Sequence, residues 1–337
     1  MKAAILKSSK IEIAELEKPT LVENKGAIVK ISGCGLCGSD IVKLKHNSVP
    51  DGTVLGHEIV GTIVEIDSES DFEVGDKIVM GHHVPCFNCT FCFGENYSMC
   101  RNFKRTNIVP GGFAEYIFVS EEHLLNTVFR ISTMISDEEI SFTEPLACCI
   151  RCIKRTNMEY NSNILIVGLG SIGILMGQAA RGLGYKPFGV DLIDDRVQLA
   201  KDYGFEDTFV LKDLEETVQE MKLTVNPAGF DAIIMTSGSD KAIDLAFKSV
   251  RDGGTINVFS SVKSDVSAYP NNEIYYRELT VTSSYSSSPV DLEEAFELLQ
   301  NHRIKTDGLS TMYPMEKLNE AISDTLSNKI MKAYITL

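Results

Sequence analysis

The sequence predicts an α/β protein of two domains, in which a doubly wound parallel sheet is inserted into a β-rich domain. Two observations lead to this fold class. Residues 1–120 contain several segments that alternate apolar and polar residues, as half-buried strands do. After residue 145, short apolar segments alternate with helical patterns instead, which is typical of βαβ units. The length of 337 residues is also more than one hydrophobic core usually holds.

The β-rich domain is expected to be built from two separated parts of the chain. In the first part, alternating segments that end at glycines or acidic turns predict strands at residues 25–35, 61–67 and 75–81. The end of the chain adds two amphipathic helices and a terminal strand, at residues 291–300, 315–326 and 332–337. These patterns place the first domain at residues 1–145 and 286–337, and the inserted domain at 146–285.

The inserted domain begins with a continuously apolar segment, residues 163–168, as expected of a strand buried on both faces. Four more strands are predicted at residues 187–192, 208–211, 231–237 and 255–260. Helices are predicted between them at residues 172–183, 195–203, 214–221 and 241–250. Strands joined by such helices pair in parallel, so we expect a parallel sheet with helices on both faces.

The composition argues against several classes of function. The formal net charge is −15 and no basic patch is segregated along the chain, which argues against nucleic-acid binding. No apolar run approaches the roughly 18 residues that a membrane-spanning helix needs. Residues 1–17 also lack the long apolar stretch of a signal peptide. We therefore expect a cytoplasmic protein that binds neither nucleic acid nor membranes.

Four of the nine cysteines lie in one short segment, Cys86-x2-Cys89-x2-Cys92-x7-Cys100. A disulfide framework is not expected in a chain of this size without an export signal. The two-residue gaps let a turn point successive thiolates at one tetrahedral zinc, and the longer gap lets the chain close around it. Because four thiolates leave no open position, this zinc is expected to be structural. An iron–sulfur cluster and free cysteines are the alternatives.

A second set of metal ligands comes from three separated places in the chain. Cys37 follows a predicted strand, and His57 and Glu58 follow a short apolar segment. Glu144 directly precedes the inserted domain. A catalytic zinc takes about three protein ligands and keeps one position for water or substrate, so a thiolate, an imidazole and a carboxylate from either glutamate suit it. Asp40 is placed to accept the other ring N–H of His57 and fix its orientation.

The inserted domain opens with a glycine-rich turn between its first strand and first helix. This GxGxxG segment supplies the candidate cofactor contacts Gly168, Gly170, Ser171, Ile172 and Gly173. Its glycines allow a tight turn close to a pyrophosphate, and the helix N-terminus attracts that anion. Asp191 ends the next strand, where an acid hydrogen-bonds the ribose hydroxyls of NAD and repels the extra phosphate of NADP. Arg196, five residues further on, is a further candidate contact, and NAD is the expected cofactor.

In this order, these motifs resemble the zinc-containing medium-chain dehydrogenase/reductase family over essentially the whole chain. The segments that carry the resemblance are GLCGSD (35–40), GHE (56–58), the four-cysteine segment, GGFAEY (111–116), EPL (144–146) and GLGSIG (168–173). The resemblance implies a GroES-like β-rich catalytic domain and a Rossmann dinucleotide-binding domain. It is closest to the sorbitol, threonine and galactitol-phosphate dehydrogenase branch, because Glu144 stands where simple alcohol dehydrogenases carry a cysteine.

The resemblance also implies roles for single residues. Cys37 and His57 resemble the catalytic-zinc ligands of the family. Glu144 would be a direct or water-bridged ligand, and Glu58 a second carboxylate that enters when water leaves. Ser39 resembles the hydroxyl that passes the substrate proton onward, and the four-cysteine segment resembles the structural-zinc site. Two zinc ions per chain are therefore expected.

One position departs from the family pattern. Many relatives carry a histidine five residues after the catalytic cysteine, which completes a proton relay to solvent, and Val42 stands there in this chain. Lys43, His46 or water would have to serve, or the relay ends at Ser39. Lys43 could instead meet an anionic group of the substrate.

The implied function is a zinc-dependent oxidoreductase that transfers hydride between NAD and a secondary alcohol, with a polyol, sugar alcohol or cyclitol as substrate. Polyol phosphates and amino alcohols of the threonine type are alternative substrates. Arg277, Glu278 and Tyr285 are expected near the substrate by analogy with polyol dehydrogenases. Relatives are commonly dimers or tetramers, so a homo-oligomer is expected.

Two other functions compete with this one. The zinc-free quinone or enoyl reductase branch would lack the four-cysteine segment and the CGSD and GHE motifs, all of which this chain has. A catalytically impaired protein that binds NAD and zinc is supported by the departure at Val42 alone. Two metals per chain would indicate the enzyme, and one metal with NAD still bound would indicate the binding protein.

Overall fold

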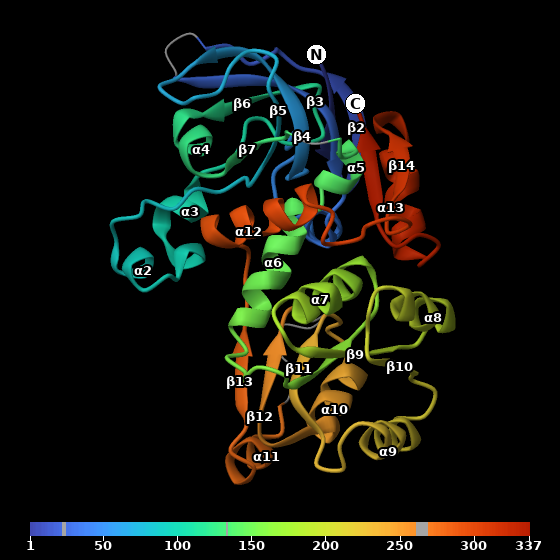
Figure 1. Ribbon diagram of the computed structural model, residues 1–337. Helices are drawn as coiled ribbons and strands as arrows, with labels where there is room; N and C mark the ends of the chain where they lie inside the picture. The colour runs from blue at the N-terminus through green and yellow to red at the C-terminus, as the bar shows by residue number, and fades with distance from the viewer. Residues whose placement is uncertain (22–24, 133, 261–268) are drawn as a thin grey trace. The chain divides into compact units, whose positions relative to one another are not determined.

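The structure is a computed structural model. It describes residues 1–21, 25–132, 134–260 and 269–337. Contacts between residues divide the chain into two compact units, and the division falls within helix α6 (Thr143–Lys154). The first unit comprises residues 1–147 and 287–337, and the second comprises residues 148–286. In Figure 1 the first unit takes the colours of both ends of the chain, and the second takes the colours between them.

The first unit is built on an antiparallel-rich sheet in the order β14-β15-β3-β4-β5-β7, with β6 paired to β3. The strands are β3 (Gly26–Gly35), β4 (Glu58–Asp67), β5 (Lys77–Met80), β6 (Tyr116–Ser120), β7 (Val128–Arg130), β14 (Thr311–Pro314) and β15 (Ala333–Thr336). A separate hairpin pairs β1 (Lys2–Lys7) with β2 (Lys10–Glu15). Alternation along β3 and β4 directs Val29, Ile31 and Ile63 into the core, because successive strand residues face opposite sides.

Short helices connect these strands. They are α1 (Gly38–His46), α2 (Thr90–Phe93), η1 (Tyr97–Met99), α3 (Arg101–Arg105), α4 (Glu121–Asn126), α5 (Asp137–Ile140), α12 (Pro289–Gln300), η2 (Met315–Lys317) and α13 (Leu318–Leu326). Helix α1 starts directly after β3, where the Cys37 N–H donates to the Asp40 carboxylate at 3.3 Å. An acid in the first turn satisfies free N–H groups there. This local start positions the side chains of residues 37–40.

The second unit is a six-stranded parallel sheet in the order β10-β9-β8-β11-β12-β13. Its strands are β8 (Asn163–Val167), β9 (Lys186–Asp191), β10 (Asp207–Val210), β11 (Phe230–Met235), β12 (Val250–Val258) and β13 (Thr280–Ser283). Its further helices are α7 (Ser171–Gly182), α8 (Asp194–Asp202), α9 (Leu214–Thr224), α10 (Asp240–Ser249) and α11 (Asn271–Tyr276). This strand order is that of the doubly wound dinucleotide-binding fold, so the predicted fold class is confirmed.

Most predicted boundaries differ from the structure by a few residues. Strand β12 begins at Val250, although a strand was predicted from residue 255, because the chain pairs through a register shift before Thr255. The terminal strand β15 begins at Ala333, so Lys332 lies just before it. Among the residues that the structure describes, no helix has the length and apolar character that a membrane crossing requires.

Candidate active site and metal centres

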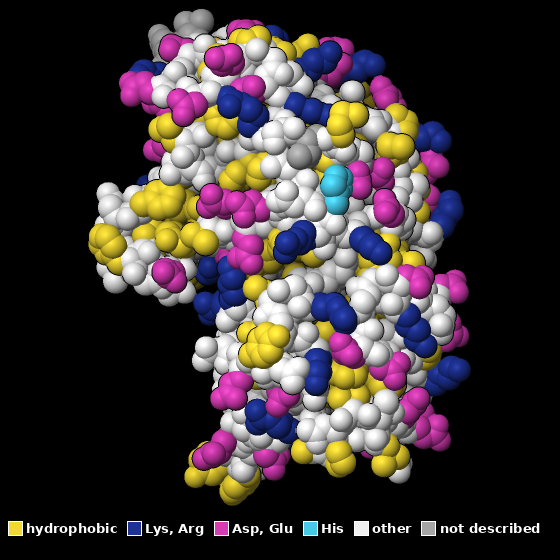
Figure 2. Space-filling model, in the orientation of Figure 1, with side chains coloured by type: hydrophobic (Ala, Val, Ile, Leu, Met, Phe, Trp, Pro, Cys, Tyr) yellow, Lys and Arg dark blue, Asp and Glu magenta, His cyan; other side chains and the backbone are white. Residues whose placement is uncertain are grey.

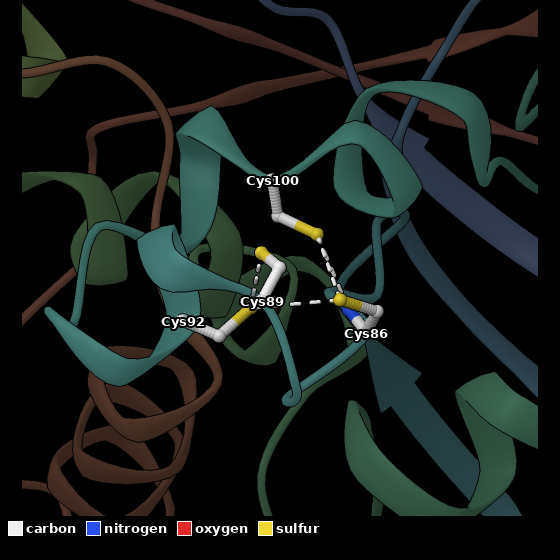
Figure 3. Close-up of side chains that lie close together, drawn as sticks. All are labelled: Cys86, Cys89, Cys92 and Cys100. Atoms are coloured by element: carbon white, nitrogen blue, oxygen red, sulfur yellow. Dashed lines mark hydrogen bonds between the residues drawn. The ribbon is translucent and has the colours of Figure 1, made fainter.

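The four cysteines of the short segment converge on one point (Figure 3). Cys89 precedes α2, Cys92 lies within α2, and Cys100 precedes α3. The Sγ–Sγ distances are 3.6 Å for Cys89–Cys92, 3.5 Å for Cys86–Cys100 and 4.0 Å for Cys86–Cys92. Tetrahedral zinc with sulfur ligands at 2.3 Å requires sulfur atoms about 3.8 Å apart. The four side chains therefore fit a zinc ion without rearrangement.

Burial and backbone contacts act in opposite directions on these thiols. Burial would raise the pKa of Cys100, but N–H groups of Cys86 and Phe103 outweigh it and lower that pKa to about 6. Burial and hydrogen bonding to Cys89 raise the pKa of Cys92 to about 12. Metal binding requires thiolates, so a dication would have to supply the charge that stabilises the anion at Cys92.

The segment around these cysteines has a very small apolar core, formed by Cys92, Cys100 and Phe103. Two other aromatic side chains of the segment stay in solvent, with exposed fractions of 42% for Phe87 and 77% for Phe93. Figure 2 shows hydrophobic side chains gathered over this region. A core this small cannot stabilise a fold by itself, so a metal bound by the four thiolates would hold this segment in one conformation.

The second group of candidate ligands lies at one end of the β3–β4 pair. Gly35 of β3 is paired with Glu58 of β4, so Cys37 and His57, which flank that pair, meet at the same end. Ligand atoms of Cys37, His57 and Glu58 all lie within 4.8 Å of one another. A thiolate, an imidazole and a carboxylate fit a catalytic zinc site with one position left for water or substrate.

The imidazole of His57 is oriented by a buried carboxylate. His57 Nδ1 lies 3.4 Å from Asp40 Oδ1, and both side chains are buried. The Gly56 N–H also donates to Asp40 Oδ1, at 3.4 Å. Burial alone would lower the pKa of His57, but Asp40 and Cys37 outweigh it and raise the pKa. With Nδ1 held by Asp40, the other ring nitrogen is left to bind a metal.

Lys332, which the sequence analysis did not single out, faces this site. Its Nζ lies 2.8 Å from Glu58 Oε1 and 2.5 Å from Glu58 Oε2, and both side chains are buried. Burial would lower the pKa of Lys332, but the negative charges of Glu58, Cys37 and Glu144 outweigh it and raise that pKa. The sequence feature that could have identified Lys332 is its position in a mostly apolar terminal segment, residues 330–337.

Glu144 and Ser39, the other two predicted site residues of the first unit, are not part of the group formed by Cys37, His57 and Glu58. Glu144 is buried in the first turn of α6, and its charge reaches Lys332. Among the described residues, however, the carboxylate grouped with Cys37 and His57 is that of Glu58. Ser39 lies in the first turn of α1, two residues from Cys37, and is exposed.

Position 42, where many relatives carry a histidine, is open to solvent. Val42 is 44% exposed, and His46 is exposed at the end of α1. The positive charge of Lys43 reaches the buried carboxyl of Asp40 and contributes to its lowered pKa, although less than His57 does and against the effect of burial. Lys43, one of the two side chains considered for the relay, therefore acts electrostatically on the site.

A row of imidazole rings continues from His57. The ring centroids of His57 and His82 are 4.6 Å apart, and those of His82 and His83 are 3.9 Å apart. Burial lowers the pKa of His82, and the neighbouring His57 and His83 lower it further. The lowered pKa favours the neutral form of His82, beside the candidate metal ligand His57. The sequence signal was a pair of histidines directly before the four-cysteine segment.

In the second unit, the glycine-rich turn has the shape that a pyrophosphate requires. Gly168 has φ +101°, which a residue with a side chain rarely adopts. A Cβ on Gly173 would lie 2.0 Å from the Gly168 carbonyl oxygen, whereas a Cβ on Gly170 would meet no atom within 4 Å. Gly173 thus lets α7 pack on the turn, and Gly170 leaves open space before the helix N-terminus. Ser171 and Ile172 form the first residues of α7.

Asp191 ends β9 beside this turn. Its Oδ2 accepts a hydrogen bond from the Leu169 N–H at 2.6 Å, and its Oδ1 accepts one from the Ile193 N–H at 3.0 Å. Arg196 of α8 lies 4.0 Å from Asp191 Oδ2. The carboxylate is therefore fixed next to the glycines, at the carboxyl edge of the sheet where such folds bind their ligands.

The expectation that Arg277 lies near the substrate is wrong. Its guanidinium donates to the Asp252 carboxylate at 2.7 Å and to the Phe247 carbonyl at 2.8 Å. These partners lie near the amino end of β12, the opposite edge of the sheet from the glycine-rich turn. Glu278 follows in a left-handed turn before β13. Tyr285, which is 62% exposed, follows the carboxyl end of β13.

Comparisons with known proteins identify the families that the chain resembles over most of its length. Residues 23–128 match the family described as alcohol dehydrogenase GroES-like domain, and residues 171–301 match the family described as zinc-binding dehydrogenase. Sorbitol dehydrogenase of Bacillus subtilis is 28% identical over 354 residues, covering 99% of this chain and 97% of its own. Galactitol 1-phosphate 5-dehydrogenase of Escherichia coli is 28% identical over 331 residues, covering 94% of each chain.

Solved structures show the same similarity. The crystal structure of galactitol-1-phosphate dehydrogenase from Escherichia coli is 27% identical and covers 100% of both chains, with a TM-score of 0.86. A putative zinc-binding dehydrogenase from Sinorhizobium meliloti, bound to NADP, is 26% identical with a TM-score of 0.88. It covers 100% of this chain and 99% of its own.

Proposed function

The chain belongs to the zinc-containing medium-chain dehydrogenase/reductase family, and on this premise we propose that it oxidises a secondary hydroxyl of a polyol with NAD. The observation that carries the proposal is the group formed by Cys37, His57 and Glu58. It has the ligand types of a catalytic zinc with an open position. The chain is thus an oxidoreductase, and its substrate and cofactor choice are the parts that we propose.

In the first unit, separate residues would bind the metal, orient the metal ligand His57 and take up the proton of the substrate. A zinc ion held by Cys37, His57 and a carboxylate would act as a Lewis acid that lowers the pKa of the substrate hydroxyl. Asp40 holds the imidazole of His57 in one orientation. We assign to Ser39 the uptake of the hydroxyl proton, since it is exposed and lies two residues from Cys37. With Val42 in place of a histidine, that proton would pass from Ser39 to solvent.

The residues of the second unit bind the cofactor. The glycine-rich turn, with its open space at Gly170, and the N-terminus of α7 would hold the pyrophosphate of NAD, which would supply the hydride acceptor. We propose NAD rather than NADP because the Asp191 carboxylate, fixed by two backbone N–H groups, would repel a phosphate on the ribose. Arg196, next to Asp191, would contact the same ribose.

Several expectations from the sequence complete the proposal. We propose two zinc ions per chain, one catalytic and one structural, and domain boundaries close to the two units described above. We further propose a homo-oligomer in the cytoplasm. The polyol assignment follows the relatives, which are sorbitol and galactitol-phosphate dehydrogenases. The charge of Lys43 near the site favours a polyol phosphate as the second candidate substrate.

The proposal is tested by metal analysis together with a substrate screen. The wild-type chain should hold two zinc ions and reduce NAD with one or more sugar alcohols, cyclitols or polyol phosphates. Cys37→Ser should hold one zinc ion and lose turnover. Cys34→Ser is a matched control, because Cys34 lies in β3, three residues before Cys37, but belongs to neither group of candidate metal ligands. A wild-type chain with one zinc ion and bound NAD, inactive on all substrates, would instead be a binding protein.

A further inference from the structure

A row of aromatic rings connects the candidate catalytic metal site to the four-cysteine lobe, by which we mean residues 86–106. The ring of His83 packs on the ring of Phe103 in the lobe, with centroids 4.9 Å apart. The same His83 ring also packs on His82 at 3.9 Å, and His82 packs on His57 at 4.6 Å. Four rings therefore form an unbroken row from the lobe to His57.

Each end of this row adjoins a candidate metal site. Phe103 is 3% exposed and forms the small apolar core of the lobe with Cys92 and Cys100, two of the four cysteines that converge there. At the other end, His57 is itself a candidate ligand of the catalytic metal. The row thus joins one candidate metal site to the other.

Hydrogen bonds tie the middle of the row to the lobe as well. The Nδ1–H of His83 donates to the Thr106 carbonyl at 2.5 Å, and the Val84 N–H donates to the Thr106 hydroxyl at 2.8 Å. The side-chain amide of Asn102, in α3, donates to the Val84 carbonyl at 3.2 Å. Because Cys100 directly precedes α3, the placement of this helix and of the residue that ends it depends on that cysteine.

We propose that His83 is a positioning residue that couples the two metal sites: with the lobe metal bound, it holds His82 against the ring of His57 and so keeps His57 oriented for the catalytic metal. The proposal rests on the function proposed above, since it needs a metal at each site. It gives the lobe a part in the active site, in addition to the stability expected of a structural zinc.

The physical argument is that the imidazole of His57 needs support at more than one place. Asp40 holds the ring at Nδ1, but one contact leaves the ring free to tilt about it. The ring of His82 limits that tilt, and His82 is in turn supported by His83. Buried side chains pack so closely that one ring cannot shift without its neighbours.

Loss of the lobe metal should remove the support of this row. The apolar core of the lobe is too small to hold its fold without a metal, so Phe103 and Thr106 would lose their fixed positions. His83 would then lose its ring contact and its hydrogen bond together. Coupling between two binding sites typically changes affinity by roughly 5–150-fold.

The coupling is measured on the cobalt-substituted full chain, as the affinity of the catalytic site for cobalt in a chelator titration. Imidazole identifies the catalytic cobalt, because it binds at the open position and changes the visible absorption, whereas a metal with four thiolates has no position to offer. Metal analysis of each sample reports whether the lobe metal is bound.

Cys100→Ser, which removes the lobe metal, should lower the cobalt affinity of the catalytic site by about fivefold or more. His83→Ala, with the lobe metal in place, should lower it by a similar factor, because it breaks the same row. In Cys100→Ser/His83→Ala the two losses should not add, since each removes the same support. Phe93→Ala is the matched control and should change nothing, because Phe93 is a 77% exposed ring of the lobe outside the row.

Wild-type cobalt affinity in Cys100→Ser, with the lobe metal absent, would overturn the proposal, and so would additive losses in the double variant. Phe103→Leu gives an independent test if Cys100→Ser does not fold. It keeps an apolar side chain in the core of the lobe but removes the ring that meets His83. This variant should keep both metals and bind the catalytic one more weakly; unchanged affinity would refute the row as the link.

Failure of this inference is distinguishable from failure of the proposed function. Should the wild-type chain hold one metal, or reduce NAD with none of the screened alcohols, the proposed function fails, whatever the variants do. Should the wild type hold two metals and oxidise a polyol while Cys100→Ser keeps the wild-type cobalt affinity, the coupling through His83 alone is refuted.

Discussion

Two glycines of the same turn should differ in how substitution by alanine changes the thermal stability of the chain. A Cβ on Gly173 would lie 2.0 Å from the Gly168 carbonyl oxygen, whereas ordinary contact starts at 3.4 Å. Helix α7 or the turn would have to move by about 1.4 Å. The obstacle is backbone, which cannot rotate away as a side-chain end can. A Cβ on Gly170 meets no atom within 4 Å and faces the space left for the cofactor.

The magnitudes follow from this geometry. Overpacking of a buried contact costs about 1–3 kcal/mol, and each kcal/mol corresponds to roughly 2–4 °C in Tm for a chain of 150–250 residues. Gly173→Ala should therefore lower the Tm by several degrees and also weaken NADH binding. Gly170→Ala should leave the Tm within about 1 °C of the wild type, because surface changes rarely exceed about 0.5 kcal/mol. It should still weaken NADH binding, since the backbone can no longer approach the pyrophosphate.

The assay pairs thermal unfolding of the cofactor-free chain with a fluorescence titration of NADH. Gly182→Ala is a matched control, because a Cβ there also meets no atom within 4 Å and the residue lies at the other end of α7. It should change neither quantity. If Gly173→Ala keeps the wild-type Tm, or Gly170→Ala binds NADH as tightly as the control, the assignment of these two glycines is refuted.

Three further variants test the other parts of the site. Asp191→Asn keeps a hydrogen-bond acceptor but removes the charge, so the preference for NAD over NADP should fall by about tenfold or more, as measured by kcat/KM with each cofactor. Asp40→Asn should weaken binding of the catalytic metal by about 10–100-fold in a chelator competition, while the second metal stays bound; equal retention of both would contradict the role of Asp40. Cys100→Ser should lose the structural metal and lower the Tm, with the metal at Cys37 retained in the folded fraction.

The parts of the site that could be predicted are those encoded over short stretches of chain. One example is the four-thiol site of Cys86, Cys89, Cys92 and Cys100. The short gaps between these cysteines keep their thiols close together in most conformations of the segment. The glycine-rich turn is similar, because a strand, three glycines and a helix start follow one another directly. In both cases the distance along the chain limits the distance in space.

The prediction for Arg277 failed because its position along the chain says nothing about which edge of the sheet it reaches. The residue follows α11 and precedes β13, so it lies at the amino edge, where Asp252 and the carbonyl groups near the start of β12 hold it. The analogy with relatives placed Arg277 near the substrate, but the direction of β13 puts this residue at the amino edge of the sheet. Tyr285, after the same strand, lies toward the carboxyl edge.

By itself, the sequence determined the fold class, the four-thiol metal site, the dinucleotide turn and the family, because each depends on residue types at short, regular spacing. Only the tertiary structure decided that Glu58, and not Glu144, is the carboxylate grouped with Cys37 and His57, and that Lys332, 274 residues further along the chain, faces it. Strand pairing across β4, β3 and β15 brings these residues together, and no spacing along the chain encodes that pairing.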